Sequence, residues 1–379
     1  MSAPLRISFF GSSLVSAYWN GAATYYRGIL RALAARGHAV TFYEPDAYDR
    51  QKHRDIPDPP WATVVVYPAD GETGVRRALA AGADADLVVK ASGVGVFDAL
   101  LEAAVLELRR PDGRRPLCAF WDVDAPATLE RVNEAAPGDP DPFRALIPRY
   151  DVIFTYGGGP PVVSAYEALG ARRCEPIYNG LDPDIHGPAE ADPRFAGDLG
   201  FLGNRLPDRE ARVEEFFLRA AATLPDRAFV LGGAGWHDKP MPPNVRAVGH
   251  VYTRDHNAFN ASTRAVLNVN RDSMARFGHS PATRVFEAAG AGACIVTDAF
   301  VGVETFFAPE REILVARDGA QVAALLAGLT VERARAIGGA ARHRALAEHT
   351  YDRRAGRVEE VLDDLLAAPR QRRAVAAGA

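Results

Sequence analysis

The segment Ser280-Pro-Ala-Thr-Arg284-Val-Phe-Glu287-Ala-Ala-Gly-Ala-Gly292-Ala-Cys-Ile-Val-Thr-Asp298 predicts a helix, a tight turn and a buried strand in one short run. Ser280 suits the N-cap position and Pro281 suits the first helical position, so we expect the helix to begin here. Gly290 and Gly292 then end the helix, and the apolar residues 293–297 predict a strand. Such a unit is typical of an α/β domain.

Arg284 and Glu287 are three residues apart and therefore share one face of the predicted helix. A guanidinium can bind a phosphate through two parallel hydrogen bonds, a carboxylate can accept from two vicinal hydroxyls, and free N–H groups at a helix start favour an anion. These groups match the polar ends of a nucleoside diphosphate. A surface ion pair on an ordinary capped helix remains an alternative from this segment alone.

Composition limits the possible classes of protein. A chain of 379 residues predicts two domains, and a net charge of −4 gives no indication of a nucleic-acid partner. Cys118, Cys174 and Cys294 are far apart and odd in number, which predicts neither a disulfide framework nor a metal site and favours the cytoplasm. No apolar run approaches the roughly eighteen residues of a membrane helix, so we expect no integral membrane segment.

Short apolar runs alternate with helical patterns along the first half of the chain, which predicts a parallel sheet wrapped by helices. The strands are expected at 5–10, 39–43, 63–67, 87–90, 116–121 and 152–156. A Pro- and Asp-rich stretch follows, and the pattern then restarts at 199–203. We therefore predict an N-terminal Rossmann-like domain over 1–180, a linker over 181–198, and a second Rossmann-like domain over 199–349.

Ligands of open α/β sheets bind beyond the carboxyl ends of the strands, so loops after strands are the candidate sites. Gly11 and Ser12 follow the first strand, and Asn20, Gly21 and Thr24 continue this small-residue loop into a helix. The loop could approach a sugar or a phosphate closely. A surface loop capped by Thr24 explains the same residues equally well.

Asp122 and Asp124 follow another predicted strand. Either carboxylate could act as a general base. The pair could also hold a divalent metal through phosphates, although the further oxygen ligands of such a site are not evident. The structural alternative is that Asp124 caps the next helix and Asp122 supports it.

The second half contains a strand-to-helix loop with a glycine and two arginines, which suits a diphosphate; a solvated basic loop is the alternative. The residues of this loop are Gly203, Asn204, Arg205 and Arg209. Gly233 lies in another glycine-rich strand end, a weak signal by itself. His250 could line a nucleobase slot and His279 precedes the predicted cap, but a lone histidine is more often structural.

Taken together, these motifs resemble the GT-B glycosyltransferases, and more narrowly the group related to the spore-maturation protein CgeB. The resemblance rests on Asn20-Gly21 with Thr24-Tyr25, Arg36-Gly37-His38, Asp122-Val-Asp124-Ala-Pro126-Ala-Thr128, Tyr178-Asn179-Gly180-Leu-Asp182, the 280–298 segment and Glu312-Ile-Leu-Val. It implies two Rossmann-like domains facing a central cleft. The first would present the acceptor, the second would bind the donor, and a last helix at about 350–368 would pack back on the first domain.

The resemblance also implies roles for single residues. Glu287 matches the ribose-binding glutamate of the family, while Arg205, Arg209 and Arg284 match its diphosphate ligands, and Asp122 and Asp124 lie where acceptor-activating residues can occur. His279 occupies the position at which the retaining branch has a second glutamate, and Arg209 stands where that branch more often has a lysine, which changes the geometry of the charge. Retention or inversion at the sugar carbon is therefore open.

The implied reaction moves a sugar from a nucleotide-diphosphate sugar to a small-molecule, glycan or other hydroxyl acceptor. Arginines and a helix N-terminus would stabilise the leaving diphosphate, so neither a metal nor a cofactor is expected. A nucleotide-sugar epimerase on the same fold and a non-catalytic nucleotide-sugar binding protein are the alternatives. An NAD-dependent oxidoreductase is disfavoured because no GxGxxG opens the first helix. The nucleobase, the sugar, the acceptor and the oligomeric state are not indicated.

Overall fold

The computed structural model describes residues 3–18, 20–134 and 140–377. The chain forms two compact units, one made of Met1–Tyr178 with Tyr351–Ala379 and the other of Asn179–Thr350. The predicted linker, 181–198, lies inside the second unit: Leu181 pairs with Thr350 in an isolated bridge, and Phe195 packs against Phe259.

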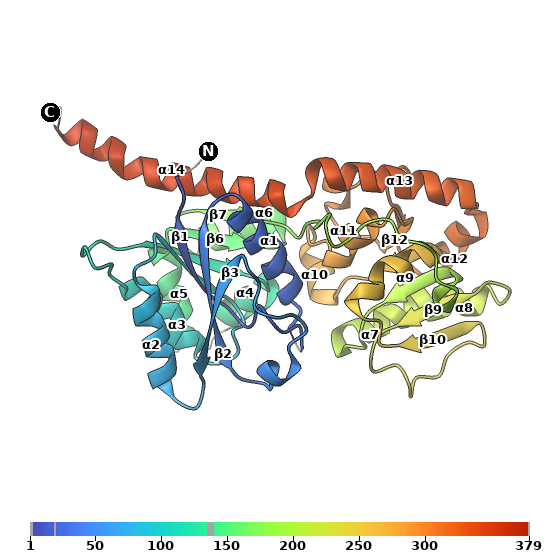
Figure 1. Ribbon diagram of the computed structural model, residues 1–379. Helices are drawn as coiled ribbons and strands as arrows, with labels where there is room; N and C mark the ends of the chain where they lie inside the picture. The colour runs from blue at the N-terminus through green and yellow to red at the C-terminus, as the bar shows by residue number, and fades with distance from the viewer. Residues whose placement is uncertain (1–2, 19, 135–139, 378–379) are drawn as a thin grey trace. The chain divides into compact units, whose positions relative to one another are not determined.

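The first unit is built on a seven-stranded sheet in the order β3-β2-β1-β4-β5-β6-β7, in which every strand pairs in parallel with its neighbours (Figure 1). The strands are β1 Arg6–Phe10, β2 Ala39–Asp46, β3 Ala62–Pro68, β4 Leu87–Ala91, β5 Leu117–Asp122, β6 Val152–Thr155 and β7 Cys174–Pro176. The helices are α1 Ala23–Ala35, α2 Glu72–Gly82, α3 Asp98–Ala104, α4 Ala125–Asn133, α5 Pro142–Leu146, α6 Gly159–Ala168 and α14 Tyr351–Ala377.

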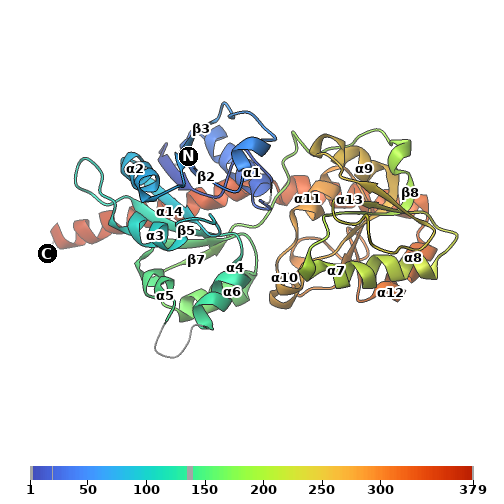
Figure 2. The same cartoon turned by 90° about the horizontal axis from the view of Figure 1, so that it is seen from below.

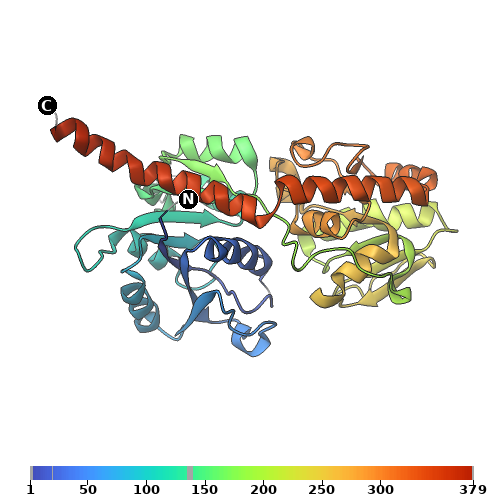
Figure 3. The same cartoon turned by 45° about the horizontal axis from the view of Figure 1, so that its top comes forward.

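Helix α14 completes the first unit although it comes last in the sequence (Figure 3). Val358, Val361 and Leu362 are buried in the same core as the apolar residues of α1 and β1. The close approach depends on Gly28, because a Cβ there would lie only 2.2 Å from the Tyr351 ring. The burial of this apolar stripe, rather than chain order, assigns α14 to the first unit.

The second unit is built on a six-stranded parallel sheet in the order β10-β9-β8-β11-β12-β13. Its strands are β8 Gly197–Leu202, β9 Phe229–Gly232, β10 Val245–Gly249, β11 Thr263–Asn268, β12 Ile295–Asp298 and β13 Leu314–Ala316. Its helices are α7 Pro207–Val213, α8 Arg219–Thr223, α9 His256–Ser262, α10 Asp272–Phe277, α11 Thr283–Gly290, α12 Gly319–Gly328 and α13 Val331–Glu348. The prediction of two α/β domains with parallel sheets is confirmed.

Helices cover both faces of this second sheet (Figure 2). Leu199 and Phe201 of β8 point into the core formed with α8 and α12, whereas Gly200 between them faces Phe259 of α9. Side chains alternate across a strand, so a strand covered on both faces needs apolar or small residues at every position. Strands β8 and β11 are parallel neighbours in the middle of the sheet, so the loops that follow their carboxyl ends lie side by side.

Candidate active site

Two arginines of the second unit converge on Gly203, the first residue after β8. A Cβ added at Gly203 would lie 3.0 Å from Nη1 of Arg209 and 3.3 Å from Nη1 of Arg284. Arg209 comes from α7, which begins in the loop after β8, and Arg284 lies in the first turn of α11. The absence of a side chain at Gly203 leaves space beside both guanidinium groups.

In the part of the chain that the structure describes, neither guanidinium forms an ion pair within 4.0 Å, although Glu287 and Asp298 attract Arg284 from further away. Burial, together with a smaller effect of the neighbouring Arg209, lowers the pKa of Arg284 to about 9. Burial also lowers the pKa of Arg209. Among the described residues, Nη1 of Arg284 and Nε of Arg209 are buried without a hydrogen-bond partner. Because unsatisfied buried donors are rare in folded proteins, two of them beside Gly203 indicate an anion-binding site.

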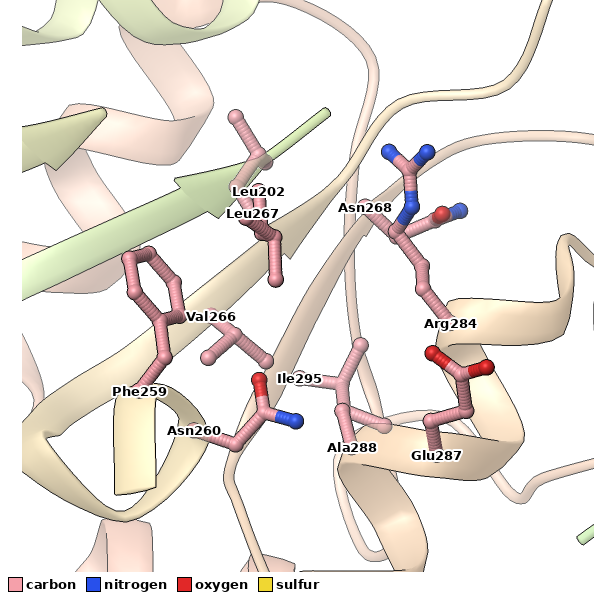
Figure 4. A pocket seen from close by; sticks show the side chains of 10 residues that line it. All are labelled: Leu202, Phe259, Asn260, Val266, Leu267, Asn268, Arg284, Glu287, Ala288 and Ile295. Carbon is pink, nitrogen blue, oxygen red and sulfur yellow. The ribbon is translucent and has the colours of Figure 1, made fainter. Parts of the chain in front are cut away.

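A pocket begins at Arg284 and extends along α11 (Figure 4). Its lining combines an apolar floor with a few polar groups: Leu202, Phe259, Asn260, Val266, Leu267, Asn268, Arg284, Glu287, Ala288 and Ile295. Figure 4 shows the Arg284 guanidinium beside the Asn268 amide, with the Glu287 carboxylate one turn further along the helix. An apolar floor with a cation at one end and a carboxylate beside it suits a nucleoside diphosphate.

Several polar residues near this pocket were missed by the sequence analysis. Nε2 of His186 lies 3.6 Å from Oε1 of Glu287, and burial lowers the pKa of His256 against the opposing influence of Glu287. His186 fell in the predicted linker, so nothing in the sequence pointed to it. Asn268 ends β11 and Asn260 lies in α9. The rule that strand ends carry ligand-binding residues could have identified Asn268.

The predicted start of the donor helix, Pro281, is wrong by two residues. Helix α11 begins at Thr283, and the Ser280 hydroxyl donates to the carbonyl of Gly278 instead of capping a helix N–H. Gly278 and His279 both have positive φ values, 71° and 44°, so the chain turns sharply before the helix can form. The His279 ring packs against Gly302, whose own φ is 88°.

Arg205 does not join Arg209 and Arg284, contrary to its predicted role at the diphosphate. Its guanidinium forms ion pairs with Glu210 at 2.7 Å and Asp238 at 2.8 Å. The side chain therefore anchors the loop after β8. Nearby carboxylates compete for each arginine, and a sequence does not show which arginine they reach.

The other predicted donor residues shape the surrounding loops. The Asn204 side chain accepts from the N–H of Ala234 at 3.0 Å. Gly233 has a φ of 129°, and a Cβ there would lie 2.2 Å from the carbonyl oxygen of Gly203, so its small size brings the two loops together. His250 is exposed beside Tyr252 and is not among the residues lining the pocket.

Asp122, predicted as the first candidate base, is completely buried in the first unit. Its carboxylate accepts from the Ser92 hydroxyl at 2.8 Å, the Thr128 hydroxyl at 3.0 Å and the Asp124 N–H at 3.0 Å, and also from the Tyr166 hydroxyl. Burial raises its pKa, while these donors lower it. A carboxylate enclosed in this way holds loops together, which favours a structural role of Asp122 over the predicted role as a base.

Asp124 is half-buried and precedes α4 without forming a side-chain cap. It therefore remains the accessible carboxylate of the predicted pair.

The small-residue loop after β1 is internally hydrogen-bonded. The Ser12 hydroxyl donates to the Asn20 side chain, which donates in turn to the carbonyls of Ser13 and Ser16. Gly11 packs against Phe42, with no room for a Cβ. Ser12 and Asn20 thus maintain the loop, whereas Gly21 is exposed and Thr24 half-buried at the start of α1.

Among the described residues, no three side chains of His, Cys, Asp or Glu lie close enough together to hold a metal ion. In the same part of the chain, no helix combines the length and apolar character needed to cross a bilayer.

Comparison with solved structures identifies the fold. The chain aligns with sucrose-phosphate synthase from Thermosynechococcus elongatus at a TM-score of 0.68 and 14% identity, covering 96% of this chain and 99% of that one. It also aligns with Anabaena HepE in complex with UDP-glucose, at a TM-score of 0.64 and 14% identity, covering 95% and 100%. The fold is that of a GT-B glycosyltransferase.

A third glycosyltransferase, AviGT4, involved in avilamycin A biosynthesis, aligns at a TM-score of 0.61 and 21% identity, covering 96% and 99%. Residues 209–360 match a family model described as glycosyl transferase-like. None of the curated proteins matches the chain by sequence. The chain therefore carries a glycosyl transferase-like region within a glycosyltransferase fold, and this region includes Arg209, Arg284 and Glu287.

Proposed function

We propose that this protein transfers a glycosyl group from a nucleoside-diphosphate sugar to a hydroxyl of an acceptor, without a metal or a cofactor. The observation that carries the proposal is the pair of guanidinium groups at Gly203, with buried donor atoms that lack partners among the described residues. The glycosyl transferase-like match over 209–360 and the solved complex of Anabaena HepE with UDP-glucose support it.

In the proposed mechanism, the second unit stabilises the leaving group. Negative charge grows on the departing diphosphate as the bond to the sugar breaks, and preorganised cations in a partly buried site stabilise this charge more strongly than water does. Arg209 and Arg284 supply two such cations, and the first turn of α11 adds its N–H dipoles. Glu287, one turn after Arg284, would accept from the ribose hydroxyls.

The acceptor would be a small molecule, a glycan or another hydroxyl compound bound by the first unit. Asp124 is the candidate for accepting the hydroxyl proton, since Asp122 is enclosed. We also propose that the chain belongs near the CgeB-like group, which is supported by the sequence motifs at 122–128 and 178–182.

Nucleotide binding tests the donor site first. A thermal-shift panel of UDP, GDP, dTDP and CDP should single out one nucleotide, because a ligand that binds the native state stabilises it. Arg284→Ala and Glu287→Ala should each weaken that binding. Arg276→Ala is the matched control, since Arg276 lies on the neighbouring α10 with a side chain that is 75% exposed and pairs only locally with Asp272.

Product analysis then distinguishes the activities that share this fold. Incubation with the matching nucleotide sugar and no acceptor, starting with UDP-glucose, should give slow hydrolysis or no reaction. A new nucleotide sugar would indicate an epimerase. Unchanged affinity in both Arg284→Ala and Glu287→Ala would refute the proposed donor site, and binding without turnover across a broad acceptor panel would favour a non-catalytic binding protein.

A further inference from the structure

The segment 179–186 runs along the donor helix α11 and contacts both of its ends. At the start of the helix, the Asn179 side chain donates to the carbonyl of Pro281 at 3.3 Å and accepts from the Thr283 hydroxyl at 2.9 Å. At its last residue, a Cβ on Gly290 would lie 2.4 Å from Leu181 and 2.9 Å from the carbonyl oxygen of His186. There is therefore no space for a side chain at Gly290.

The segment is itself tied into the second unit. The N–H groups of Ile185 and His186 both donate to the carbonyl of Asp182, at 3.2 Å and 2.9 Å, and form a tight turn. The Asn257 side chain donates to the carbonyl of Ile185 at 2.8 Å, which attaches the turn to α9. His186 therefore approaches α11 from a turn that these hydrogen bonds hold in place.

His186 points at the middle of α11, where Glu287 lies. Its Nε2 is 3.6 Å from Oε1 of Glu287, and the residue is only 4% exposed. Nδ1 of His186 is buried without a partner among the described residues. Of the two ring nitrogens, Nε2 is therefore the one that faces the carboxylate.

The contact between His186 and Glu287 affects where the Glu287 carboxylate lies relative to the charged groups around it. Arg284 precedes Glu287 by three residues on the same helix, and His256 of α9 also lies within its electrostatic reach. Arginine and glutamate at this spacing readily form an ion pair. In the described structure no Arg284–Glu287 ion pair occurs within 4.0 Å. A direct pair would neutralise Arg284 and remove the anion site.

We propose that His186 is a positioning residue that holds the Glu287 carboxylate in the pocket and away from the Arg284 guanidinium. The inference rests on the proposed function, because it takes Glu287 and Arg284 as the ligands of the ribose and the diphosphate. It assigns to 179–186 the role of a brace for the donor site, in place of a linker.

The test compares two variants of His186 by calorimetric titration with the best nucleotide of the panel. His186→Phe keeps a ring of similar size but removes the polar nitrogen that lies 3.6 Å from the Glu287 carboxylate, and it should weaken binding about tenfold. His186→Gln keeps an N–H group near the position of Nε2 and should remain within about threefold of the wild type. Both variants should retain the wild-type unfolding temperature within a few degrees.

A double-mutant cycle separates positioning from packing. In a Glu287→Ala background, His186→Phe should cause no further loss of affinity, because the carboxylate that it positions is absent. An equal loss in both backgrounds, or equal behaviour of the Phe and Gln variants, overturns the inference. If Glu287→Ala has no effect on nucleotide affinity, the inference is overturned, and if Arg284→Ala has none either, the proposed function fails as well.

Discussion

Replacing Arg284 with methionine should stabilise the nucleotide-free protein while it removes nucleotide binding. The Arg284 guanidinium lies over the Phe201 ring at 5.5 Å, so an uncharged chain of similar length can fill the same space. A pKa of about 9 in place of 12.5 corresponds to a cost on the order of 4–5 kcal/mol for the charged side chain. This cost already includes the attraction to Glu287 and Asp298. Because methionine loses the contact of the guanidinium with the Phe201 ring, we expect a smaller net gain of about 2 kcal/mol in unfolding free energy.

The gain should depend on pH in a defined direction. Below about pH 9, Arg284 is charged in both the folded and the unfolded protein, so the wild type bears the full cost. Above that pH the folded protein releases the proton while the unfolded chain keeps it, and the cost declines. The stability difference between Arg284→Met and wild type should thus be constant from about pH 6 to 8 and shrink above about pH 9.

Urea denaturation across this pH range measures the stability difference, and calorimetric titration measures nucleotide affinity. Arg284→Met should lose about a hundredfold in affinity, the scale expected for a bidentate contact to phosphate, and should show no thermal shift with nucleotide. Arg284→Lys is the matched control that keeps a positive charge. The reasoning is refuted if Arg284→Met is less stable than the wild type without nucleotide, or if nucleotide still stabilises it.

Two further predictions concern Gly203 and Asp122. Gly203→Ala places a methyl group 3.0 Å from Arg209 and should weaken nucleotide binding at least about tenfold in titrations, whereas Gly187→Ala, with nothing within 4 Å of the new methyl, should bind normally. Asp122→Ala should cost about 3 kcal/mol or more in denaturant unfolding, because four buried donors lose their acceptor, while Asp124→Ala should cost less than about 1 kcal/mol. Wild-type stability with lost activity in Asp122→Ala would show a direct catalytic role instead.

The alternation of apolar strands and helices was enough to predict both parallel sheets. Buried parallel strands need continuous apolar runs, and helices need a period of 3.6 residues, so these local patterns appear directly in the sequence. The same periodicity placed Arg284 and Glu287 on one helix face. The strand-end rule pointed to Gly203 and Arg209 for a similar reason, because the topology of a parallel sheet brings such loops together.

The sequence did not determine which partner each charged side chain meets. Arg205 lies four residues before Arg209, yet it pairs with Glu210 and Asp238, while Arg209 turns to Arg284. Asp122 follows its strand as predicted, but it is enclosed by donors of the following residues 124–128 and by Ser92 and Tyr166 from two other segments. Each outcome depends in part on groups that are distant in the sequence, Asp238 for Arg205 and both Ser92 and Tyr166 for Asp122.

By itself, then, the sequence determined the two α/β domains and the composition of the donor loop and helix, because backbone periodicity and strand-end position are local properties. Tertiary structure alone decided that Ser280 turns back to Gly278, that Asp122 is enclosed, and that His186 reaches Glu287. Burial and charge pairing are set by side chains that only the folded chain brings together. The chemistry of the pocket depends on those long-range contacts.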